Sequence, residues 1–188
     1  AEKALDETLR LNESLEPGEV DLIISGHMFV HPSGKAHPEM TGIYADSLIP
    51  GLAALAGAVH EAGGLVAAQI SHGGMQCRPE AVSDPMAPSD VDAPFLRWPA
   101  REMTPEEISS IIDAYGAAAR RAQEAGFDAV QIHGAHGYLI SEFLSPYTNR
   151  RADEWGPGGA SGSAHALEGR TRFLRAVCLA IREQVGPD

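Results

Sequence analysis

The sequence has few cysteines and no long apolar run, and both absences limit the class of protein. Its 188 residues include two cysteines, Cys77 and Cys178, which lie far apart and form no CxxC pair. This excludes a disulfide framework and a zinc ribbon and fits a reducing compartment. No apolar run approaches the roughly 20 residues of a membrane span. Because residues 1–3 also show no signal-peptide pattern, we expect a cytoplasmic protein without a membrane partner.

Positive charge is scarce as well. The chain has 14 Lys and Arg residues against 26 Asp and Glu residues, a formal net charge of −12. An acidic chain repels phosphate backbones and anionic lipids, so we expect neither nucleic acid nor a membrane surface as a partner. Hydrophobic residues make up 44% of the chain, enough for one sizeable core, and we expect one domain over residues 1–188.

An amphipathic helix, a glycine and a short apolar run that ends in polar residues recur along the chain. Apolar runs at 20–24, 65–70 and 127–132 predict three strands, and helices are predicted near 4–15, 52–62, 104–125 and 167–185. The third helix has Thr104 as N-cap, Pro105 as its first residue and Glu107 completing a capping box. The last helix should turn five residues inward: Phe173, Leu174, Val177, Cys178 and Ile181.

This alternation predicts an α/β fold with parallel strands, because a short hairpin cannot join parallel neighbours. Three strands make either half of an α/β barrel or a small open sheet without a phosphate-binding loop. Two segments interrupt the pattern. Residues 73–103 contain five prolines and predict a long loop, and residues 156–166, rich in Gly, Ala and Ser, predict a flexible insertion.

Polar residues gather where the predicted strands end, which is where parallel α/β folds build their sites. They are Ser25, Gly26, His27, Gln69, Ser71, His72, His133, His136 and Tyr138. His133 and His136 lie on one tight loop, where two neutral imidazoles can each donate an N–H to one substrate oxygen, as an oxyanion hole does. The phenol of Tyr138 can supply a proton.

Two other interpretations of the histidines stay open. Imidazole is the commonest metal ligand, but HxxH without a nearby carboxylate or cysteine is a weak zinc pattern. Capping and packing are the remaining roles. His27, His31 and His37 flank a Pro/Gly loop, for which a solvated loop is favoured over a set of ligands.

The same residues carry a family resemblance. Residues 102–121 and 124–139, with the run HGAHGYL at 133–139 and FLSP at 143–146, resemble the Old Yellow Enzyme family of FMN-dependent ene-reductases, in its NADH:flavin oxidoreductase and 2,4-dienoyl-CoA reductase branch. The segment QISHGG at 69–74 matches the family's QLxHxGR stretch as far as Gly74. Further matching residues are Asn149, Arg150, Asp153, Glu154 and Trp155.

The resemblance implies a (β/α)8 barrel, here a partial one with about strands 2 to 4. It implies FMN and NAD(P)H as cofactors and an α,β-unsaturated carbonyl or thioester as substrate. Gln69 would bond the flavin pyrimidine edge, Gly26 would lie against the isoalloxazine, and His133 and His136 would bind the substrate oxygen beside the flavin. Tyr138 would donate a proton or position the substrate. No metal is implied.

The chain also departs from the family. Met75 stands where the family usually has Arg, and residues 156–166 interrupt a normally compact turn. The family's first strand and its strands after the fourth are not in these residues. A half-barrel has two open sheet edges, so self-association into a homo-oligomer is a possible arrangement. The alternatives to a segment of an ene-reductase are a non-catalytic half-barrel that needs a partner chain and, less favoured, a metal-dependent α/β hydrolase.

Overall fold

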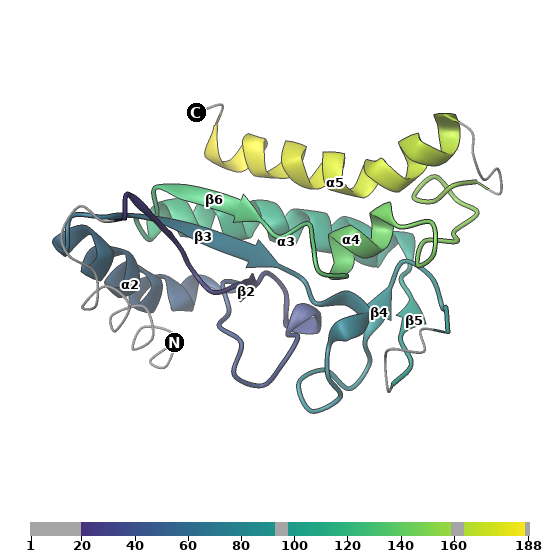
Figure 1. Ribbon diagram of the computed structural model, residues 1–188, viewed down its shortest axis with the longest axis horizontal. Helices are drawn as coiled ribbons and strands as arrows, with labels where there is room; N and C mark the ends of the chain where they lie inside the picture. The colour runs from purple at the N-terminus through teal and green to yellow at the C-terminus, as the bar shows by residue number, and fades with distance from the viewer. Residues whose placement is uncertain (1–19, 93–97, 159–163, 187–188) are drawn as a thin grey trace.

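The computed structural model describes residues 20–92, 98–158 and 164–186, so the helix predicted at 4–15 lies outside the described residues. One parallel sheet runs through the molecule, with helices packed along it (Figure 1). Its strands are β1 (Leu22–Ile24), β2 (Met28–Phe29), β3 (Leu65–Ser71) and β6 (Ala129–Ile132). β3 is the central strand and pairs with β1 and β2 on one edge and with β6 on the other.

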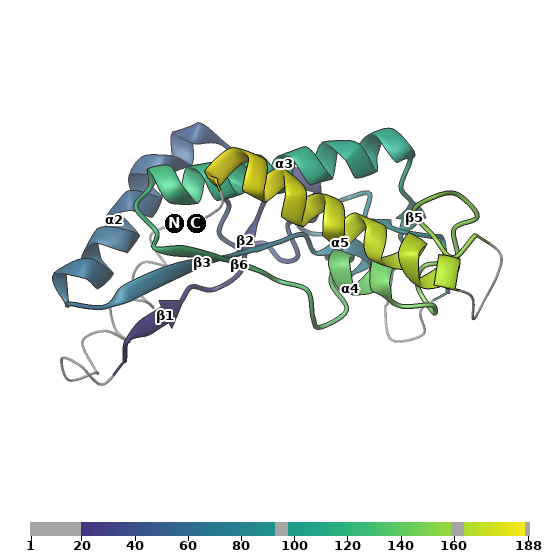
Figure 2. The ribbon, with the colours of Figure 1, turned by 90° about the horizontal axis from the view of Figure 1, so that it is seen from above.

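The two faces of this sheet have different surroundings. Val66, Ala68 and Ile70 of β3 are fully buried against the helices α2 (Ile49–Glu61) and α3 (Pro105–Glu124), which lie to one side of the strands (Figure 2). On the opposite face apolar side chains stay open to solvent: Leu22 is 45%, Ile24 45% and Leu65 50% exposed. The sheet is therefore covered like the wall of a barrel on its outer face, and its inner face is open.

A bulge separates β1 from β2 and changes which side chains face inward. Ile24 is paired with Ala67 and Met28 with Ile70, so residues 25–27 lie opposite two residues of β3. The hydroxyl of Ser25 accepts a hydrogen bond from the backbone N–H of Gln69 at 3.1 Å and replaces a ladder partner there. An extra residue reverses the alternation of side chains. Met28 consequently enters the helix-side core, where it is 1% exposed.

Local chemistry accounts for the start of α3 and the end of α2. The predicted capping box of α3 is confirmed, because Thr104 Oγ1 accepts from the N–H of Glu107 and the Glu107 carboxylate accepts from the N–H of Thr104. After α2 the chain turns at Gly63, whose φ of 84° favours glycine. The sequence did not predict α4 (Leu139–Leu144), which follows the loop after β6.

The long helix α5 (Ala164–Val185) lies along α3 and α4, and one of its predicted inward residues is wrong. Phe173, Val177 and Ile181 are buried and Leu174 is partly buried, as expected, but Cys178 is exposed. Cys178 lines a groove of about 470 Å³ between α5, α3 and β6. No described strand pairs with that edge of β6, so nothing among the described residues covers the thiol.

The predicted long loop at 73–103 contains a 3-10 turn, η3 (Gly74–Gln76), and a short parallel pair, β4 (Met86–Ala87) with β5 (Arg101–Glu102). The predicted insertion at 156–166 overlaps the start of α5, and residues 159–163 lie outside the described part of the chain. None of the helices in residues 20–92, 98–158 and 164–186 is long and apolar enough to cross a membrane.

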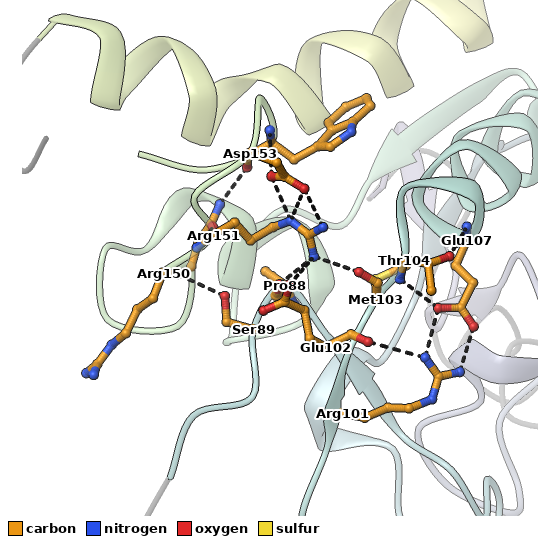
Figure 3. A network of polar contacts seen from close by, with 12 residues as sticks. Pro88, Ser89, Arg101, Glu102, Met103, Thr104, Glu107, Arg150, Arg151 and Asp153 are labelled. Carbon is orange, nitrogen blue, oxygen red and sulfur yellow. Dashed lines mark hydrogen bonds and ion pairs between the residues drawn. The ribbon is translucent and has the colours of Figure 1, made fainter. Parts of the chain in front are cut away.

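Arg151 holds this long segment against the rest of the molecule (Figure 3). Its buried guanidinium donates to the carbonyl oxygens of Pro88 at 2.8 Å and Met103 at 2.7 Å, which lie at the two ends of the β4–β5 region. The carboxylate of Asp153 accepts from the same guanidinium at 2.5 Å and supplies the compensating charge. One side chain therefore ties three segments that are distant in the sequence.

We expect Arg151→Met to lower the free energy of unfolding by about 3–5 kcal/mol, because it leaves two buried carbonyls and the Asp153 carboxylate without their partner. Urea unfolding followed by circular dichroism measures the change. The matched control is Arg150→Met at the neighbouring exposed residue, with an expected loss below about 1 kcal/mol. Equal losses in the two variants would contradict the role of Arg151.

Candidate active site

The loop that leaves β6 positions the predicted histidine pair. The backbone N–H of His133 still bonds to the Ile70 carbonyl at 3.0 Å, so this residue continues the sheet and its position is fixed. The chain then turns through His136, which has a φ of 57°, and Gly137, which has a φ of 71°. A left-handed conformation is uncommon and costly for a residue other than glycine, and residues in strained conformations cluster at functional sites.

Three aromatic rings meet at this turn as the sequence predicted. The His133 ring centroid lies 5.1 Å from that of His136 and 4.9 Å from that of Tyr138, and both pairs are edge-to-face. Tyr138 is half-buried and stands at the N-cap of α4, which fixes its backbone. The amide side chain of Gln76 donates to the His136 carbonyl at 2.6 Å and attaches the 73–103 segment to the same turn.

A fourth ring, that of His27, joins this cluster; the sequence placed His27 among the polar residues at the strand ends but favoured a solvated loop for it. Its centroid lies 5.7 Å from that of His133 and 5.2 Å from that of Tyr138. His37 lies beyond it at 5.8 Å, partly exposed and 3.4 Å from the Glu39 carboxylate. The expectation that His27 belongs to a solvated loop is therefore wrong, because the bulge turns it toward the inner face.

Burial keeps the inner imidazoles neutral. Desolvation lowers the pKa of His133 below its ordinary value, and the nearby His136 lowers it further. Desolvation and then the charge of His133 lower the pKa of His27 to about 4. Nδ1 of His133 lies 3.4 Å from the N–H of Ala135 and accepts from it, so Nε2 carries the ring proton. A neutral imidazole with an available N–H can donate to an oxygen that gains negative charge.

Amide groups lie on the same inner face of the sheet. Gln69 and Gln131 are paired across β3 and β6, and the Gln69 side-chain amide donates to the Gln131 carbonyl oxygen. Gly26 lies in the bulge, and a Cβ built on it would meet no atom within 4 Å. The structure therefore combines open space beside Gly26 with amide donors and acceptors, which suits a planar ligand that has hydrogen-bonding edges.

His72 and His31 belong to a separate buried network. Nδ1 of His72 accepts from the N–H of Gly74 at 3.1 Å, so its Nε2 donates to the Ser33 hydroxyl, also at 3.1 Å. That hydroxyl donates to Nδ1 of His31 at 2.7 Å. A Cβ on Gly34 would lie 2.4 Å from the His72 ring, so glycine is required there. These residues hold two loops together, and the expectation that His31 lies in a solvated loop is wrong.

The structure therefore divides the predicted polar residues into two groups. His133, His136 and Tyr138 meet at one point, and Gln69 and Gly26 lie on the adjacent inner face. Ser71 and His72 are fully buried behind them. Among the described residues, no three His, Cys, Asp or Glu groups are arranged to hold a metal ion. The sequence analysis did not single out Gln131, which the strand register sets opposite Gln69, or Arg151, which bonds to two remote carbonyls. It named His27 but did not predict that a bulge brings this ring to the cluster.

We expect the NMR titration of the histidine rings to place the pKa of His27 near 4 and that of His72 near 3, since burial disfavours the charged ring in both. The unfolded chain takes up these protons at about pH 6.5, whereas the folded chain does not. Stability should therefore be fully present above about pH 6.5 and should fall progressively as the pH drops from 6.5 to about 3. A pKa near 6.5 for both rings in the folded protein would contradict this description.

The sequence of the chain is similar to those of known proteins. A family model described as the NADH:flavin oxidoreductase / NADH oxidase family matches residues 15–188. The chain is 48% identical over 140 residues to a probable NADH-dependent flavin oxidoreductase of Bacillus subtilis, which covers 73% of this chain and 37% of the relative. It is 41% identical over 166 residues to an NADPH dehydrogenase of Clostridium acetobutylicum, covering 88% of this chain and 46% of the relative.

Solved structures show the same fold. A 2-naphthoyl-CoA reductase in complex with 2-naphthoyl-CoA superposes with a TM-score of 0.86 at 33% identity, covering 99% of this chain and 28% of that one. An old yellow enzyme homologue from Zymomonas mobilis gives a TM-score of 0.82 at 35% identity, covering 98% and 51%. The predicted α/β class and partial barrel are confirmed, and the chain spans about half or less of the length of these relatives.

Proposed function

The chain belongs to the NADH:flavin oxidoreductase / NADH oxidase family, and from this premise we propose that it is the part of an FMN-dependent ene-reductase that binds the substrate oxygen. The observation that carries the proposal is the contact between His133, His136 and Tyr138 at the carboxyl end of β6. The proposed substrate is an alkene activated by a carbonyl or thioester group. We place the protein in the cytoplasm, with NAD(P)H as the hydride source.

The inner face has residues suited to FMN. The open space beside Gly26 leaves room for a flat ring system, and Gln69, paired with Gln131, presents an amide to the edge of such a ring. His133 lies one residue beyond β6 on the same face and would contact both flavin and substrate. Bound FMN would accept hydride from NAD(P)H and supply it to the β-carbon of the alkene.

The residues of the chain would stabilise the charge that this addition creates. Hydride arrival at the β-carbon moves an electron pair onto the carbonyl oxygen. The N–H groups of His133 and His136 would donate hydrogen bonds to that oxygen, and His133 is held in the required neutral form by burial. The α-carbon then takes a proton from the phenol of Tyr138, which recovers a proton from water. Desolvation raises the pKa of Tyr138, so the phenol is protonated and available.

A non-catalytic half-barrel is the second candidate, and the open inner face favours it. Leu22, Ile24 and Leu65 are between 45% and 50% exposed, and the outer edges of β1 and β6 pair with no strand among the described residues. A second copy of the chain would cover these edges and form a homo-oligomer. The histidine and tyrosine cluster favours the enzyme, because a purely structural module has no need of three polar rings at one turn.

His133→Ala in the full-length, flavin-loaded protein should lower kcat/KM for the alkene. The expected loss corresponds to roughly 2–4 kcal/mol of transition-state stabilisation, the usual scale for losing one oxyanion donor. Steady-state kinetics with a range of activated alkenes measures the change. The matched control is His60→Ala, which removes an exposed imidazole bonded to Asp128 at the amino ends of the strands. If His133→Ala retained the kcat/KM of the control, the assigned role would be wrong.

Gln69→Ala should weaken flavin retention more than it raises the KM for the alkene, because it removes an amide from the proposed flavin edge and leaves the imidazoles in place. Flavin content after dialysis and the KM of reloaded protein give the two quantities. Gln123→Ala, at the exposed end of α3, is the control and should change neither. A larger effect on KM than on flavin retention would argue against this placement of the cofactor.

A further inference from the structure

His27 is a member of the ring cluster to which the proposed reaction gives no role. It reaches the cluster because of the bulge at 25–27. In regular alternation Met28 would share the inner face with Ile24, but the extra residue sends Met28 into the helix-side core. The side chain of His27 is thereby turned toward the inner face, beside His133 and Tyr138. Bulges in other proteins re-aim side chains next to active sites in the same way.

The contact with Tyr138 is the flattest of the ring contacts that His27 makes. The two rings are stacked, with centroids 5.2 Å apart and planes inclined by 26°. The contacts with His133 and His37 are edge-to-face, inclined by 65° and 64°. Nδ1 of His27 is buried and has no hydrogen-bond partner among the described residues. The imidazole is therefore oriented by its ring contacts and not by a hydrogen bond to Nδ1.

Several contacts hold the side chain of Tyr138, and the stacking with His27 is one of them. Its backbone is fixed at the N-cap of α4, where its N–H bonds to the Ala135 carbonyl at 3.2 Å. The side chain packs beside Phe29, Ala36 and Met40, which cover part of the ring, and the edge of His133 touches it. His27 supplies a flat surface against one ring face, so rotation of the phenol would break the stacking.

We propose that His27 is a positioning residue: by stacking on Tyr138 it holds the phenol beside His133, in the orientation from which it gives its proton. The inference rests on the proposed function for the role of Tyr138, whereas the stacking itself does not. Burial is consistent with this role, since the lowered pKa of His27 keeps the stacked ring uncharged at neutral pH.

The positioning role requires only a flat ring at residue 27, whereas a hydrogen-bonding role would require a ring nitrogen. His27→Phe keeps a planar ring of similar reach and removes both ring nitrogens. His27→Ala removes the stacking surface. A positioning role through stacking therefore predicts that phenylalanine rescues the function and alanine does not, and a direct bond from His27 to the substrate predicts that both variants fail.

The first experiment tests the stacking in the chain itself, without any need for flavin. The chain has four tyrosines, so tyrosine labelled with ¹³C in the ring gives a simple aromatic NMR spectrum, in which Tyr138→Phe identifies the Tyr138 signal. His27→Ala should move that signal toward the position of an unstacked ring and leave the other three in place, and His27→Phe should not. An unmoved Tyr138 signal in His27→Ala would overturn the proposal, even if the protein proves to be an ene-reductase.

The second experiment is a double-mutant cycle in the full-length, flavin-loaded protein. His27→Ala should lower kcat for alkene reduction about tenfold with little change in KM, and His27→Phe should restore it to within about threefold. In the Tyr138→Phe background His27→Ala should have no further effect, because the residue through which it acts is gone. Effects that multiply in the double variant, or a loss that falls on KM in both backgrounds, would overturn the positioning role.

A failure of the proposed function has a different signature. In that case the unmodified protein neither retains flavin nor reduces an alkene, and the NMR arm alone decides whether His27 orders Tyr138. Thermal unfolding of His27→Ala and His27→Phe completes the test, because a role in folding alone would lower the midpoint and leave the kcat of the folded fraction unchanged. That last result would also overturn the proposal.

Discussion

The pairing of β3 with neighbours on both edges is the constraint on which the site depends. Because β1, β2 and β6 all run parallel to β3, the carboxyl ends of the strands point to the same end of the sheet. The register sets Gln69 opposite Gln131, and one residue beyond β6 it fixes His133 through the bond to the Ile70 carbonyl. The helices on the outer face bury the alternate residues, and the other set, which includes Gln69 and Gln131 near the carboxyl ends, faces inward.

Burial then determines the chemistry of these side chains. An imidazole that loses contact with water is held neutral, and a neutral ring with a fixed tautomer is a hydrogen-bond donor of defined direction. His133 obtains its tautomer from the N–H of Ala135, and His72, in a structural network, obtains its own from the N–H of Gly74. Two histidines of the same chemical state therefore have different roles, because one borders the open inner face and the other lies fully inside.

Much of this arrangement could be predicted from the sequence, and the parts that could not share a cause. The capping box from Thr104 to Glu107 and the meeting of His133, His136 and Tyr138 depend on residues close together in the chain, so local patterns were sufficient. His27 was assigned to a solvated loop because a bulge leaves no signal in a sequence read strand by strand. Arg151 bonds to carbonyls 63 and 48 residues away, a contact that side-chain patterns do not reveal. Cys178 fits the helical period of α5, yet it is exposed, because no described strand pairs with the edge of β6 that faces away from β3.

The central claim is that these residues are the substrate-oxygen side of a flavin enzyme, and one spectroscopic experiment on the full-length protein tests it directly. The protein is purified, its visible absorption is recorded, and NAD(P)H and then an activated alkene are added without oxygen. The account predicts bound FMN, loss of the flavin absorption band with NAD(P)H, and its recovery with an alkene conjugated to a carbonyl or thioester, at a rate that falls in His133→Ala. A protein without flavin, or a reduced flavin that no activated alkene reoxidises, would contradict it.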